Sequence, residues 1–238
     1  MIEGLLAETP DPARLAGLAR GRLREKLPAL ECALTGQVGP HQRFLLAQQL
    51  AHIDYLDATI ERVSAEVAER LHPFDETLTR LETIPGVGRR GAEIVAAELG
   101  LEAARFPSAA HLAAWAGLAP GNHESAGKRL SGKTRKGSPA LRTALVEAAQ
   151  AAARTKDTCL AAQDRRLAPR RGQKRAVVAV AHTILVIIYH LLRDGTTYRD
   201  LGATYFNERD RHAVEHRLVR RLEALDNTVT IQRRDPAA

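Results

Sequence analysis

The residues best suited to chemistry lie in one short stretch around a serine. Ser125 is followed by Ala126-Gly127 and then by Lys128 and Arg129. A serine hydroxyl is a weak nucleophile until its proton is removed or the developing charge is stabilised, and cationic side chains stabilise that charge on a phosphoryl group. The spacing therefore fits attack by Ser125 on a phosphoryl centre, with His123 as a candidate base. On spacing alone the alternative stays open, in which the serine only caps a turn or contacts a phosphate passively.

The serine opens a glycine-containing stretch that is dense in positive charge. Five basic side chains follow it, which are Lys128, Arg129, Lys133, Arg135 and Lys136. A flexible cationic loop of this kind suits contact with a phosphate backbone, and Arg142 adds a further charge in the next predicted helix. Basic runs are often merely solvated, but the regular glycines and the preceding Trp115 favour nucleic-acid contact.

A second candidate phosphate site is the glycine turn at residues 84–88, whose sequence is Ile-Pro-Gly-Val-Gly. Gly86 and Gly88 accept unusual backbone dihedrals, and the free N–H groups at the start of the following helix attract anions. Arg89 and Arg90 add charge at the same place. The pattern predicts a helix-hairpin-helix element that holds a nucleic-acid backbone without reading its sequence. The alternative is a tight turn that only packs.

The distribution of charge supports a polyanionic partner. The chain has 238 residues and a formal net charge of +7. Between residues 121 and 175 there are fourteen Lys and Arg against four Asp and Glu, so this segment carries more positive charge than the whole chain. A surplus focused in this way points to nucleic acid.

The composition predicts an all-α fold, because Ala, Leu and Arg dominate and aromatic residues make up only 4%. We expect two domains, a helical linker and coiled-coil arm over residues 1–73 and a helical domain containing the helix-hairpin-helix over residues 74–238. The expected helices cover residues 12–34, 41–71, 75–83, 89–99, 108–116, 140–154, 176–193 and 211–225. Residues 117–138 are expected to form a loop.

The long helix over residues 41–71 carries a heptad pattern. Leu46, Ile53, Ile60 and Val67 recur every seven residues, and Leu56 and Val63 occupy the complementary positions. About three heptads indicate a coiled coil and hence a homo-oligomer. An antiparallel hairpin with residues 12–34 explains the same pattern equally well.

Other features point to a cytoplasmic protein without a membrane partner. Residues 176–192 are apolar but short for a membrane span and contain His182 and His190, so we expect a buried core helix. The only cysteines, Cys32 and Cys159, lie far apart without metal-ligand spacing, and no secretory signal is evident. No metal site is predicted within the chain.

Three stretches of the sequence resemble the transposase domain of the insertion sequence 110 family. They are LETIPGVGRRGAEIVAAELG at residues 81–100, the segment from Arg105 to Ala149 that contains HESAGKR, and residues 152–206. Residues 11–30 and the long helix are similar to that family's linker and coiled coil. The resemblance covers nearly the whole chain.

The resemblance implies a recombinase that uses a serine nucleophile. It places the nucleophile at Ser125, which would form a covalent bond to a DNA strand end while the surrounding Lys and Arg hold the scissile phosphate. It also implies a structured guide RNA that pairs with donor and target DNA.

The resemblance further implies a resolvase-like α/β domain whose four acidic residues bind a divalent metal such as Mg²⁺. No segment of that kind precedes residue 40, so we expect the metal to belong to an N-terminal domain that this chain lacks. Metal-assisted cleavage needs those carboxylates. The expectation is a transposase fragment that is inactive alone and competent when complemented. The alternative is a non-catalytic module that binds nucleic acid and dimerises.

Overall fold

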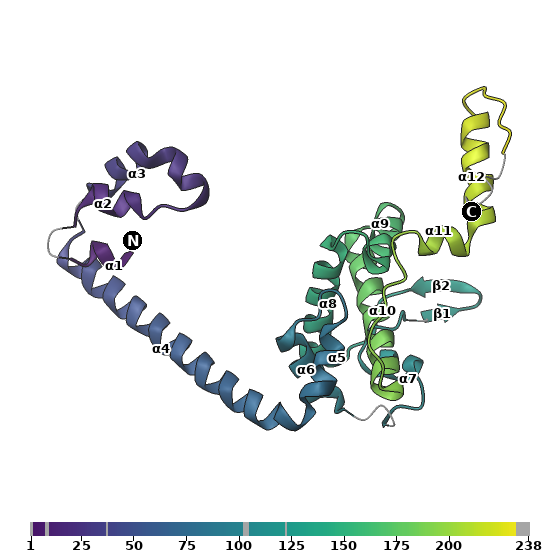
Figure 1. Ribbon diagram of the computed structural model, residues 1–238, viewed down its shortest axis with the longest axis horizontal. Helices are drawn as coiled ribbons and strands as arrows, with labels where there is room; N and C mark the ends of the chain where they lie inside the picture. Colours follow the sequence, from purple (N-terminus) through teal and green to yellow (C-terminus); the bar gives the residue numbers. More distant parts are fainter. Residues whose placement is uncertain (1, 8–9, 37, 102–104, 122, 232–238) are drawn as a thin grey trace, which may run out of the picture. The chain divides into compact units, whose positions relative to one another are not determined.

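The computed structural model describes residues 2–7, 10–36, 38–101, 105–121 and 123–231. The chain divides into two compact units, residues 1–72 and 73–238, and each is described here by itself. The predicted all-α fold is confirmed, because helices supply almost all the regular structure and the described residues contain a single two-stranded sheet (Figure 1).

The first unit begins with short helices. They are α1 (Ile2–Leu5), α2 (Pro12–Gly17), the 3-10 helix η1 (Gly21–Lys26) and α3 (Leu27–Leu34). The Asp11 carboxylate accepts hydrogen bonds from the backbone N–H groups at the start of α2, as N-capping side chains do. The single helix predicted over residues 12–34 is wrong, because Gly21 takes a φ of 58° and interrupts it.

The long helix α4 (Pro40–Leu71) completes the first unit. It contacts α1, whereas α2 packs against α3. None of its 32 residues is buried, and the predicted seam residues Ile53, Ile60 and Val63 are each more than half exposed. The apolar seam of α4 is therefore open to solvent in the single chain.

The remaining helices lie in the second unit, except that η2 begins at His72, the last residue of the first unit. They are η2 (His72–Phe74), α5 (Asp75–Glu82), α6 (Arg89–Leu99), α7 (Ala109–Trp115), α8 (Pro139–Arg154), α9 (Cys159–Arg171), α10 (Gln173–Asp194), α11 (Tyr205–Arg209) and α12 (Arg211–Glu223). Ser138 caps α8 and Thr158 caps α9 through their side-chain oxygens. The sequence left α9 and α11 unassigned.

The most apolar helix, α10, lies at the centre of this unit. It packs against α5, α7, α8 and α9, and its buried residues include Val180, Ile184, Leu185 and Ile188. The prediction of a core helix is therefore confirmed. Among the described residues, α10 alone has the length and hydropathy that a membrane span would also need, and half of its most apolar window is buried in the unit.

Part of the predicted loop over residues 117–138 is a β-hairpin. Strands β1 (His123–Ser125) and β2 (Lys128–Ser131) pair antiparallel. The two residues between them, Ala126 and Gly127, both have positive φ, 49° and 72°. Positive φ at both central positions is the turn geometry that matches the twist of paired strands. The short, irregular strands show no alternating pattern, which is why the sequence indicated a loop.

Candidate nucleic-acid interface

Ser125 ends β1, where it pairs with Lys128 across the two-residue turn. Both residues are exposed, and the hairpin projects from the helices (Figure 1). Within the described part of the chain, no residue hydrogen-bonds the Ser125 hydroxyl. The side chains of His123 and Arg129 lie outside the described part, so the predicted base is not placed. The turn thus presents a hydroxyl and an ammonium side by side to solvent.

The basic segment over residues 133–137 runs back along residues 116–121 with backbone against backbone. A Cβ atom on Gly117 would lie 2.7 Å from the Arg135 oxygen, and one on Gly121 would lie 2.1 Å from the Lys133 oxygen. A Cβ atom on Gly137 would lie 2.3 Å from the Ala116 carbonyl. The glycines are therefore required for this close approach. The segment is fastened to the unit, in contrast to the flexible loop that the sequence predicted.

Arg142 fastens the same segment from α8. Its Nη1 donates to the Gly117 oxygen at 2.8 Å and to Thr134 Oγ1 at 3.0 Å. These bonds join the two backbone stretches that the glycines bring together. The structure thus gives Arg142, a predicted phosphate contact, a positioning role toward the segment that carries the other cations.

Four of the predicted phosphate contacts are exposed cations without a carboxylate partner. Among the ion pairs of the described residues, none involves Lys128, Lys133, Arg135 or Lys136. Arg135 and the three lysines therefore outnumber the one acid of the hairpin, Glu124, and leave a net positive charge on the hairpin and the basic segment.

The glycine turn has two glycines with different surroundings. Gly86 has a φ of 86°, and a Cβ atom there would lie 2.1 Å from the Ala148 oxygen and 2.8 Å from the Ala152 nitrogen. Gly86 therefore lets the turn pack against the backbone of α8. Gly88 precedes α6, and no atom lies within 4 Å of the Cβ position there. Only the second glycine leaves its backbone open to an approaching ligand.

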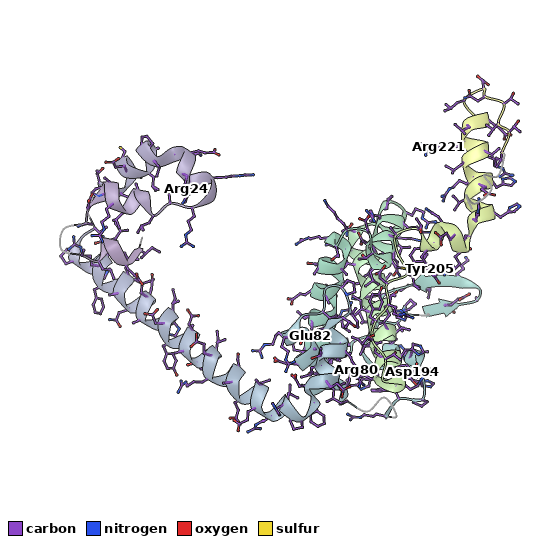
Figure 2. All side chains as sticks on the ribbon, in the orientation of Figure 1. Arg24, Arg80, Glu82, Asp194, Tyr205 and Arg221 are labelled. Atoms are coloured by element: carbon purple, nitrogen blue, oxygen red, sulfur yellow. The ribbon has the colours of Figure 1, made fainter. Side chains whose placement is uncertain are left out.

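The arginine at the start of α6 is surrounded by acids. Arg89 lies 2.5 Å from Asp75, 3.4 Å from Glu82 and 3.6 Å from Glu93; Glu82 is labelled in Figure 2. The hydrogen bond that Arg89 donates to the Asp75 carboxylate is the main cause that raises the pKa of Arg89. Three carboxylates thus offset much of the charge predicted to attract phosphate.

Arg90 is also paired, at 3.0 Å from Glu93. The sequence did not reveal these acids as neighbours, because Asp75 lies fourteen residues before Arg89 along the chain. Glu93 could have been recognised from the sequence, because it lies four residues after Arg89 and three after Arg90 on the same predicted helix.

The glycine turn and the basic segment contact different parts of α8. Gly86 meets Ala148 and Ala152, whereas Arg142 holds the basic segment near the start of the helix. Along a helix axis, residue 142 is about 9 Å from residue 148 and about 15 Å from residue 152. The predicted site therefore separates into two surfaces, and Ser125 belongs with the basic segment.

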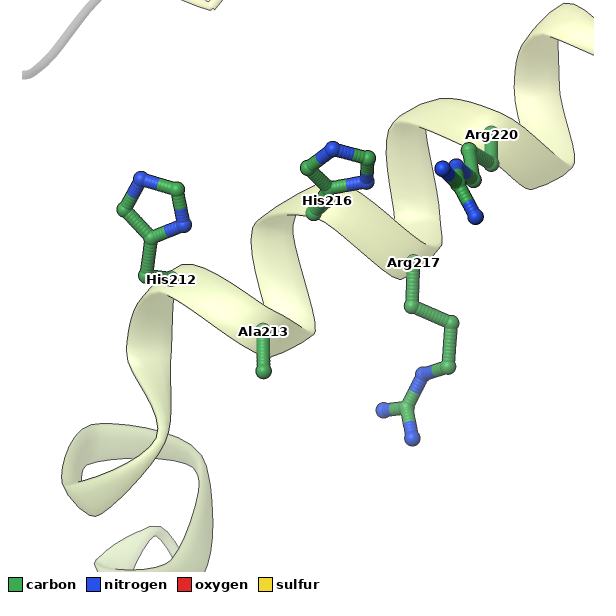
Figure 3. Close-up of a pocket in the computed structure, with 5 residues that line it drawn as sticks. All are labelled: His212, Ala213, His216, Arg217 and Arg220. Carbon is green, nitrogen blue, oxygen red and sulfur yellow. The ribbon is translucent and has the colours of Figure 1, made fainter.

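A hollow in the second unit lies on α12, away from Ser125. It is lined by His212, Ala213, His216, Arg217 and Arg220, all from one face of that helix (Figure 3). Because a single helix supplies the whole lining, it is an open face and does not enclose a substrate.

Comparison with known proteins gives a consistent picture. Residues 78–164 match the family described as "Transposase IS116/IS110/IS902 family". The chain is similar to the "Transposase for insertion sequence element IS1111A" of Coxiella burnetii, with 31% identity over 188 residues, which is 76% of this chain and 51% of the relative.

Two further relatives are transposases by their descriptions. The "Probable family 20 transposase" of Pseudomonas aeruginosa is 32% identical over 162 residues, 65% of this chain and 46% of that protein. The "Putative transposase y4pF/y4sB" of Sinorhizobium fredii is 36% identical over 135 residues, 55% and 35% respectively. The chain spans about half the length, or less, of the curated relatives that it matches.

Proposed function

Since the chain belongs to the IS116/IS110/IS902 family of transposases, we propose that it binds DNA through the β1–β2 hairpin and the basic segment, with Ser125 as the nucleophile of insertion-sequence transposition. One observation carries this proposal. An exposed hydroxyl lies next to Lys128 on a projecting turn, and exposed cations without carboxylate partners follow it.

The arrangement suits phosphoryl transfer. The Ser125 Oγ would attack the phosphorus of a phosphodiester, so that a new P–O bond forms to the serine. The P–O bond to the departing deoxyribose oxygen breaks, that oxygen takes up a proton, and the serine proton passes to a base. Lys128 would stabilise the charge that develops on the phosphoryl oxygens, as preorganised cations do in other active sites. The cations of the basic segment would hold the flanking backbone.

The proposal includes two further partners. A structured guide RNA has the same phosphodiester backbone as DNA and would be attracted by the same cations. A second copy of the chain would cover the apolar seam of α4, because exposed isoleucine and valine at heptad spacing favour pairing of helices.

A divalent metal is part of what the family resemblance implies. Within the described residues, no three His, Cys, Asp or Glu side chains lie together in a way that could hold an ion. The described side chains therefore do not fit a metal centre, and the proposal gives no step to a metal held by them.

The second candidate is a module that binds nucleic acid and dimerises without chemistry. It is favoured by the lack of any hydrogen bond to the Ser125 hydroxyl in the described part, since an unactivated hydroxyl is a poor nucleophile.

A denaturing-gel assay separates the two candidates. End-labelled element DNA is incubated with the chain, guide RNA, Mg²⁺ and the acidic domain of a relative. We expect a covalent adduct with the wild type and with the control Ser64→Ala, a half-buried serine of α4 outside the hairpin and the basic segment, and none with Ser125→Ala. An adduct of equal yield with Ser125→Ala would overturn the nucleophile assignment. No adduct from a wild-type chain that still binds the DNA would favour the binding module.

A further inference from the structure

We propose that the turn between α9 and α10 is a second surface for a phosphodiester backbone, suited to a double-stranded nucleic acid. The basic turn is defined by five exposed side chains, Arg165, Arg170, Arg171, Lys174 and Arg175. This inference rests on the proposed function in taking nucleic acid as the partner, but it involves other residues than the hairpin and the basic segment.

The charge of the basic turn is not compensated. None of its five cations forms an ion pair with a described carboxylate. Some other exposed arginines are paired, for example Arg70 with Glu66 and Arg211 with Glu215, both at 2.7 Å. Arg166 lies in the same stretch but is excluded, because it is 3.5 Å from Asp210 and stacks over Phe206.

The only acidic residue among residues 164–175 is buried. Asp164 is only 7% exposed, and both of its carboxylate oxygens accept from Gln173 Nε2, at 3.1 and 3.2 Å. This contact joins the body of α9 to the first residue of α10. The carboxylate therefore fixes the turn and is not presented beside the cations.

The fold alone does not account for the positions of these charges. Arg170 and Arg171 lie in the last turn of α9, where cations interact favourably with the helix dipole. Lys174 and Arg175 lie in the first turn of α10, where the same dipole disfavours a cation. Like charges crowded on both sides of Gly172 also repel one another. A bound polyanion would reverse both effects.

The turn is shaped for access to a backbone. Gly172 has a φ of 83°, and no atom lies within 4 Å of the position that a Cβ atom would take. The cations therefore flank an open convex turn. Residues 164–175 contain no aromatic side chain, and the nearby Phe206 ring is already contacted by the guanidinium groups of Arg166 and Arg209. Stacking on the bases of a single strand is therefore not favoured there. Contact with the phosphates of a duplex needs only the cations.

The basic turn and the hairpin surface have no residue in common. The basic turn lies at the start of α10, whereas Tyr189, near the other end, donates a hydrogen bond to the Phe106 oxygen just before α7. Residues 173 and 189 are about 24 Å apart along a helix axis. Figure 1 shows α9 and α7 beside opposite ends of α10. Variants of the two surfaces can therefore be compared independently.

The test compares two variants of equal charge by fluorescence anisotropy with a 20-base-pair DNA duplex. The turn variant replaces Arg171, Lys174 and Arg175 with Gln. The matched control replaces Arg70, Arg193 and Arg211 with Gln, which are exposed and paired with carboxylates. We expect the turn variant to raise Kd at least about tenfold at low salt and to flatten the salt slope by about two units. The control should remain within about twofold of the wild type.

The outcomes separate this inference from the proposed function. A turn variant that matches the control overturns the basic turn as a binding surface. In that case the proposed function stands if a second variant, with Lys133, Arg135 and Lys136 replaced by Gln, still binds the duplex more weakly than the wild type. A wild type that does not bind the duplex overturns both. Binding of the same variants is also measured with an RNA duplex and with vesicles containing phosphatidylserine. A loss of vesicle binding with unchanged duplex affinity also overturns the inference, and circular dichroism confirms that each variant is folded.

Discussion

Arg89 Nη2 lies 2.5 Å from Asp75 Oδ1, so the first residue of α6 is tied to the first residue of α5 across the glycine turn. Glu82 and Glu93 complete a set of three acids around the same guanidinium. The sequence presents the glycine turn as a source of positive charge, but these acids largely offset the charge of Arg89 at the start of α6.

The first prediction concerns this acidic surround. Replacing Arg89 and Arg90 with Gln should flatten the salt dependence of DNA binding much less than replacing Lys133, Arg135 and Lys136, because only the second group lacks carboxylate partners. The Asp75→Asn variant should bind slightly more tightly. Anisotropy titrations at several salt concentrations measure both effects. If both variants change the slope of affinity against salt concentration equally, the glycine turn is a principal phosphate contact after all.

A second prediction uses the two glycines of the turn. Gly86→Ala places a methyl group against the α8 backbone at a positive φ and should lower the free energy of unfolding by about 2–4 kcal/mol. Gly88→Ala meets open space and should change it by less than about 1 kcal/mol. Denaturant titration measures both. Similar losses in the two variants would contradict the packing role of Gly86.

The third prediction concerns Arg142 as the fastening of the basic segment. Arg142→Gln removes two hydrogen bonds and should expose residues 133–136 to trypsin, so that cleavage there becomes several-fold faster. The free energy of unfolding should fall by about 1–3 kcal/mol. Arg154→Gln, on the same helix and exposed, is the control. Unchanged cleavage in the Arg142 variant would show that the glycine contacts alone hold the segment.

A fourth prediction follows from His182 on α10. Burial lowers the pKa of this imidazole below its ordinary value near 6.5, so the unfolded chain binds the proton more readily than the folded one. The stabilising effect of the neutral form is complete above about pH 6.5 and is lost as the pH falls toward the folded pKa. His182→Leu should therefore make stability less dependent on pH between about 5 and 7. An unaltered pH profile in thermal melts would exclude this residue as a cause.

The fifth prediction concerns self-association of the chain through the long helix α4. Ile53→Gln together with Ile60→Gln should weaken self-association at least about tenfold, because both side chains lie on the exposed seam of α4. The control pair Asp54→Gln and Glu61→Gln alters the adjacent polar positions. Analytical ultracentrifugation measures the oligomeric state. A wild type that stays monomeric at high concentration would remove the coiled-coil proposal.

The sequence by itself determined the features that depend on neighbouring residues. Helix-forming composition and the heptads of α4 act over a few helical turns, so the all-α class and most helix positions could be predicted. Ser125 and Lys128 were recognised together for the same reason, since only two residues separate them. The functions of these residues remain predictions.

Only the tertiary structure decided which residues meet across long separations. Gly86 faces Ala148, Arg89 faces Asp75, and Arg142 bonds to Gly117. No local pattern encodes such pairs, because packing of whole helices sets them and one sequence motif is compatible with several neighbours. That packing places Gly86 against α8 and Arg89 among three acids, and it leaves the lysines and arginines of the basic segment and of the basic turn without carboxylate partners.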